Sequence, residues 1–123
     1  MDKREILELS KSCLDAPGEM HVRGAHTFAD DDEAHDDDRQ DRLNAEFRAQ
    51  LDRYIRFLEA EYGPATVVDL ESDSVDEAAA EEASSLVEDA LQLAFWQQED
   101  ATLYVAMTQA DREAPLALVI GAQ

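Results

Sequence analysis

The spacing of apolar residues predicts a long amphipathic helix in the middle of the chain. Between residues 39 and 62, large apolar side chains recur every three or four positions: Leu43, Phe47, Leu51, Tyr54, Ile55, Leu58 and Tyr62. This spacing places them along one side of a helix of about six turns. Asp38 or Asp41 is expected to cap its start, and Gly63 followed by Pro64 is expected to end it.

Two shorter helices are predicted on either side of this one. Residues 2–14 carry Ile6, Leu9 and Cys13 at helical spacing, and Pro17-Gly18 stops them. After residue 73, Ser74-Val75-Asp76-Glu77 matches a capping box. The helix that follows has an apolar stripe rich in alanine, made of Val75, Ala79, Ala83, Leu86, Ala90 and Leu93. The acidic residues of this helix fall mostly outside the stripe.

The C-terminal third has the period of strands. Residues 91–97, 102–108 and 115–120 are apolar runs separated by short polar linkers, which is typical of an antiparallel meander. Residues 65–70 read as a further short strand or an extended link. The expected fold is α+β, with two or three helices packed on one face of a C-terminal three-stranded antiparallel meander, in a single domain spanning 1–123.

Residues 17–38 are expected to form a long acidic loop. They contain Pro17, Gly18, all three histidines and an acidic run at 30–38, with few large apolar residues. A short strand at Met20–Val22 is an alternative for its beginning. Carboxylates suit Ca²⁺ or Mg²⁺, but the run lacks the EF-hand pattern, so a solvated, self-repelling segment is the favoured interpretation.

The charge of the chain is its most unusual property, with thirty Asp and Glu against ten Lys and Arg and a formal net charge of −20. No Lys or Arg occurs from Phe57 to Asp111, whereas acids continue throughout that stretch. Binding to nucleic-acid phosphates or to anionic lipid is disfavoured, because both need clustered bases. A basic protein is the partner that this charge favours.

No residue pattern points to catalysis or to a cofactor. His21, His26 and His35 do not have metal-ligand spacing, and Cys13 lies on the apolar side of a helix, as a small core residue would. The serines lack a nucleophile elbow, and there is no phosphate-binding loop. We therefore expect no catalytic residues, no metal and no cofactor. A single cysteine, the absence of an apolar leader after Met1 and the absence of an apolar run of membrane-spanning length predict a cytoplasmic protein.

The leading hypothesis is a non-enzymatic acidic protein that captures a basic partner. The residues expected to contact the partner are the acids of the third helix, with one aromatic anchor if its side chain is exposed: Glu77, Glu81, Glu82, Glu88, Asp89 and Trp96. Pairing with a second copy through an open meander edge or an apolar helix stripe is also open.

A resemblance points in the same direction. The long helix ending in Glu61-Tyr62-Gly63-Pro64, the Trp-containing strand, Leu103-Tyr104-Val105, the acidic turn and Pro115-Leu116-Ala117-Leu118 resemble small bacterial immunity proteins of toxin–immunity systems, over roughly the C-terminal two-thirds of the chain. The resemblance implies neutralisation of a cognate toxin, often a basic nuclease, by covering its active surface.

Three alternatives stay open at this point. A small-ligand-binding protein or an enzyme would have its site between the sheet and the long helix. A DNA mimic would space its carboxylates like phosphates, beginning with the acidic helix. A high-salt habitat would account for the charge alone, and would spread acids over the whole surface.

Overall fold

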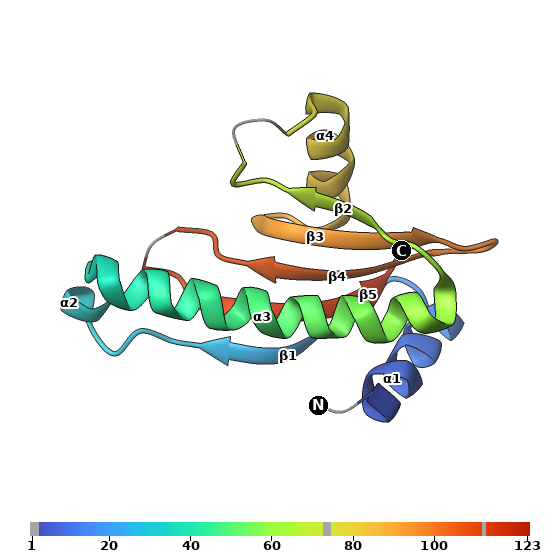
Figure 1. The fold of residues 1–123 in the computed structure, drawn as a ribbon, viewed down its shortest axis with the longest axis horizontal. Helices are drawn as coiled ribbons and strands as arrows, with labels where there is room; N and C mark the ends of the chain where they lie inside the picture. The colour runs from blue at the N-terminus through green and yellow to red at the C-terminus, as the bar shows by residue number, and fades with distance from the viewer. Residues whose placement is uncertain (1–2, 73–74, 112) are drawn as a thin grey trace.

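The computed structural model describes residues 3–72, 75–111 and 113–123, in which helices pack on both sides of a five-stranded antiparallel sheet (Figure 1). The helices are α1 (Lys3–Asp15), α2 (Asp31–Ala34), α3 (Asp37–Tyr62) and α4 (Glu77–Leu86). The strands are β1 (Met20–His26), β2 (Thr66–Asp69), β3 (Ala90–Gln97), β4 (Thr102–Thr108) and β5 (Leu116–Ala122). Their order across the sheet is β1-β5-β4-β3-β2.

The α+β class and the C-terminal meander are confirmed, but the sheet is larger than a meander. Strands β3, β4 and β5 pair in sequence, as predicted. Strand β2 adds to β3 on one side and β1 adds to β5 on the other. The meander edges that were expected to be open to a second copy are therefore occupied, and the edges of the sheet are β1 and β2.

The prediction of one long loop over 17–38 was wrong, because this segment contains β1 and α2. The alternative of a short strand at Met20–Val22 is confirmed, and that strand continues to His26. Strand β1 is held by pairing with β5, from Met20 opposite Gly121 to His26 opposite Leu116. Its own sequence has few apolar residues, and the pairing joins segments far apart in the chain. The pattern of neighbouring residues in the sequence does not predict a pairing between segments so far apart. The acidic run supplies the short helix α2, capped by Asp30, and the start of α3.

The helices cover opposite faces of the sheet, whereas the sequence predicted that they share one. On the front face, α1 and α3 pack over side chains such as Trp96, Val105 and Ile120. On the back face, Ala83 and Val87 of the α4 segment pack with alternate residues of the same strands, such as Leu93 and Phe95. Successive strand residues point to opposite faces, so a continuous apolar run such as β3 has two faces to cover.

Two helix boundaries differ from the prediction for identifiable reasons. Helix α3 begins at Asp37, because the side chain of Asp36 accepts a hydrogen bond from the backbone N–H of Arg39. Helix α4 ends at Leu86 instead of continuing into the apolar run, and Val87 already has an extended backbone. Glu88 and Asp89 consequently lie in the turn before β3, outside the helix.

Candidate functional site

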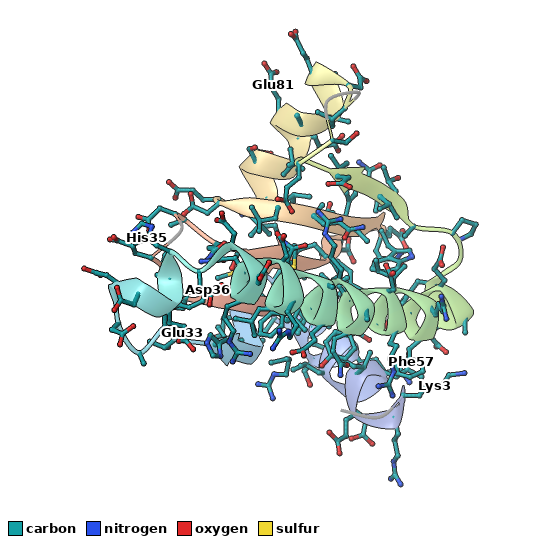
Figure 2. All side chains as sticks on the ribbon, turned by 60° about the vertical axis from the view of Figure 1, so that its left-hand side comes forward. Lys3, Glu33, His35, Asp36, Phe57 and Glu81 are labelled. Atoms are coloured by element: carbon teal, nitrogen blue, oxygen red, sulfur yellow. The ribbon has the colours of Figure 1, made fainter. Side chains whose placement is uncertain are left out.

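Five carboxylates were expected from the sequence to bind the partner, and all are exposed: Glu77, Glu81 and Glu82 on α4, and Glu88 and Asp89 in the turn that follows it. We call these five residues the α4 acids. Asp76 caps the helix by accepting a hydrogen bond from the backbone N–H of Ala78. The predicted capping residue Ser74 lies outside the described residues. Buried Ala83 and partly buried Ala79 bring the helix close to the sheet, leaving its charged side chains directed outward. In Figure 2, Glu81 projects away from the body of the molecule.

The turn after α4 fixes the last two of these carboxylates. Asp89 has a φ of 63°, in the left-handed region, where Asp and Asn are tolerated better than other residues with a Cβ. Its carbonyl accepts a hydrogen bond of 3.1 Å from the backbone N–H of Gln109, which joins the turn to the end of β4. The carboxylates of Glu88 and Asp89 are thus attached to a backbone held by the sheet.

The cations, and not the anions, are unevenly placed. Carboxylates decorate all four helices, as the high-salt interpretation expects. In contrast, the Lys and Arg side chains of the described residues all belong to α1, β1 and α3. Salt bridges among the described residues involve those bases or the histidines, and none involves an α4 acid. Arg112 lies outside the described residues.

Trp96 is buried, so it is not available as an exposed anchor. Its side chain is 3% exposed, and its indole N–H donates a 2.8 Å hydrogen bond to the carbonyl of Gly63. It belongs to the core between α3 and the sheet. Tyr104, on the back face, is 4% exposed. The large apolar residues that are exposed among the described residues are Met20, Val22 and Val67. The sequence did not predict their exposure, because it depends on the position of β1 and β2 at the edges of the sheet.

A hollow of about 460 Å³ lies beside the end of α4 on the back face. We call it the back-face hollow; its lining includes Met20, Leu86, Val87 and Pro115, with Glu88 and Asp89 also contributing. It therefore joins an apolar surface to two of the α4 acids. Sequence reasoning missed it, because its walls come from β1, the α4–β3 turn and the β4–β5 linker.

Arg48 forms the most extensive ion-pair network, on the front of the molecule. Its guanidinium donates to the carboxylates of Asp69, at 3.2 Å, and Glu71, at 2.5 Å, and to the side-chain oxygen of Gln92. The hydrogen bond from Arg48 holds the pKa of Asp69 below its ordinary value, more than the partial burial of the carboxyl raises it. The network fastens α3 to β2 and β3, which is a structural role.

The acidic segment around α2 is held by histidine–glutamate contacts. An imidazole nitrogen of His26 lies 3.3 Å from a carboxylate oxygen of Glu33, and one of His35 lies 3.0 Å from a carboxylate oxygen of Glu113. The pKa of Glu33 is lowered, first by a hydrogen bond from the backbone N–H of Ala29 and then by His26. Among the described residues, no group of three or more His, Cys, Asp or Glu side chains is arranged to hold a metal ion.

The residues with shifted pKa values do not converge on a cleft between the sheet and α3. That space is filled by the front core, in which burial raises the pKa of the Cys13 thiol. The side chain of Cys13 is 2% exposed, which agrees with a core residue. A second hollow, of about 270 Å³, lies beside Trp96, and its lining includes Tyr62, Glu82 and Gln97.

Comparisons with known proteins add no relative. No protein-family model matches the chain, and no match was found among curated proteins or solved structures. Within the described residues, no helix is both long enough and apolar enough to cross a membrane.

Proposed function

We propose that this chain is a non-enzymatic acidic binding protein that captures a basic protein through the α4 acids. One observation carries the proposal: these carboxylates are exposed, and the Lys and Arg side chains of the described residues lie on other elements. Carboxylates that are not neutralised by neighbouring bases attract a basic partner and accelerate its association.

The chemistry of such an interface is electrostatic at its edge and apolar at its centre. Protein interfaces commonly have an apolar core and a polar rim. Here Glu88 and Asp89 border the back-face hollow, and Met20 and Val22 are each about half exposed on the same face. An immunity role, in which the basic partner is a toxin, is the specific form of this proposal that the sequence resemblance suggests.

A charge-matched pair of variants tests the proposal. The partner would be isolated from the source organism with the intact chain as bait, and its dissociation constant then measured by calorimetry. In the first variant, Glu81, Glu82, Glu88 and Asp89 are changed to Lys. In the second, the exposed α3 acids Asp41, Glu46, Asp52 and Glu61 are changed to Lys, which alters the net charge equally.

The two variants should differ strongly. Each exposed ion pair is worth about 0.5 kcal/mol, so losing four weakens binding by about 2 kcal/mol, or roughly 30-fold in Kd. The α3 variant should lose much less. Equal losses would mean that the partner responds to total charge alone, as under the high-salt interpretation, and capture that survives the α4 changes would exclude the proposed surface.

A further inference from the structure

The back-face hollow is the place where apolar and acidic surface meet. Met20, on β1, is 52% exposed and lines it together with Leu86, Val87 and Pro115. Val22, at 53% exposed, lies two residues further along β1 and therefore points to the same side of the sheet. Their strand partners Gly121 and Val119 confirm this side, because Val119 belongs to the back-face core.

The rim of this hollow is negative. Glu88 and Asp89 are exposed, and neither makes a salt bridge among the residues that the structure describes. The left-handed backbone at Asp89 and the hydrogen bond from Gln109 to its carbonyl hold this turn against β4. A hollow with aliphatic walls can accept an aliphatic side chain of a bound molecule. Its anionic rim can then contact a cationic side chain next to that one.

We propose that the back-face hollow receives an aliphatic side chain of the basic partner, with an adjacent Lys or Arg of that partner contacting Glu88 and Asp89. This inference rests on the proposed function and specifies the partner segment: basic residues alternating with aliphatic ones. A second copy of the chain fits less well, because each copy carries a net charge of −20 and would bring the same carboxylates to the contact.

Methionine methyl groups provide the test. Met20 lines the hollow, whereas Met107 is fully buried on the opposite face and serves as an internal control. The full chain, labelled with ¹³C at its methionine methyls, is titrated with a short peptide of alternating lysine and leucine. Two further peptides alternate lysine with serine and glutamate with leucine. A Met20→Leu variant assigns the resonance.

The expected result is a saturable shift of the Met20 methyl with the lysine–leucine peptide, a much weaker response to the other two, and no change at Met107. Changing Glu88→Gln together with Asp89→Asn should weaken the peptide about three- to tenfold, the effect of two exposed charge pairs. The matched control, Glu99→Gln with Asp100→Asn, removes two exposed acids from the turn at the other end of β3 and should leave Kd within about twofold.

Three outcomes would overturn the inference. If the lysine–serine peptide shifts Met20 equally, the hollow does not select an aliphatic side chain. If calorimetry shows that the lysine–leucine peptide binds but the Met20 methyl does not shift, the hollow is not used; loss of that binding when Glu77, Glu81 and Glu82 are changed to Gln would leave the proposed function standing. If the Met20 shift changes with protein concentration in the absence of peptide, the occupant is a second copy.

Discussion

Gly121 is the position at which a single methyl group should be most damaging. It lies in β5, opposite Tyr104 on one side and Met20 on the other. A Cβ at this position would lie 2.5 Å from the hydroxyl oxygen of Tyr104, 2.7 Å from its Cζ atom and 2.7 Å from the carbonyl oxygen of Glu19. Contacts this short essentially never occur, so Gly121→Ala requires both the ring and the backbone to move.

The size of the effect follows from how little room there is to relax. Tyr104 is 4% exposed, and the backbone near Glu19 is fixed by a 2.7 Å hydrogen bond from the N–H of Gly18 to the carbonyl of Ala122. Overpacking a core typically costs about 1–3 kcal/mol, and two obstacles place this substitution at the upper end. Replacing glycine by alanine also lowers the conformational entropy of the unfolded chain, which offsets the loss of stability by about 0.5 kcal/mol. We expect the free energy of unfolding to fall by about 2–3 kcal/mol, and Tm by about 10 °C.

The assay is urea unfolding followed by the fluorescence of Trp96, with thermal unfolding followed by circular dichroism. Gly24→Ala is the matched control, because a Cβ there meets only the Cδ1 atom of Leu118, at 3.9 Å. Its free energy of unfolding should stay the same or rise by up to about 1 kcal/mol. Adding Tyr104→Phe to Gly121→Ala removes the shortest contact and should recover part of the loss. If both glycine variants were equally stable, close packing at Gly121 would not be the reason for its glycine.

Three further predictions concern single interactions. Trp96→Phe removes the hydrogen bond to Gly63 and should lower the free energy of unfolding by about 1–2 kcal/mol in urea denaturation monitored by circular dichroism; an unchanged value would mean that this bond contributes nothing net. Asp76→Ala removes the cap of α4 and should cost about 1 kcal/mol, whereas Asp76→Ser should retain most of it, and equal losses would argue against capping. The pKa of Asp69 is depressed in the folded state, so its contribution is complete above the unfolded pKa of about 3.9 and is lost as the pH falls through the folded value. With Asp69→Asn, the free energy of unfolding should therefore decline less steeply with falling pH than in the parent, when both are measured by urea denaturation from about pH 5 to about pH 2. An identical slope would mean that the Asp69–Arg48 pair does not cause the decline.

The sequence predicted the elements whose pattern is local. The apolar stripe from Leu43 to Tyr62 is strong enough to specify α3, and Gly63 ends it as expected. Strand β4 occupies 102–108, as its alternating pattern predicts. The exposure of the α4 acids also follows from the sequence, because a helix that uses alanine for its buried side has its charged residues left for the solvent. The net charge, and hence the preference for a basic partner, is a property of composition alone.

Which strand or sheet face each of these elements packs against was decided only by the tertiary structure. Strand β1 exists because β5 offers it hydrogen-bonding groups, and α4 covers the back because apolar runs such as β3 present alternate residues to both faces. Burial of Trp96 and exposure of Met20 depend on these placements, as does the hollow that joins Met20 to Glu88. Local sequence fixes backbone preferences over a few residues, whereas the position of a side chain relative to solvent depends on segments distant in the chain, and that is the level at which the candidate binding surface arises.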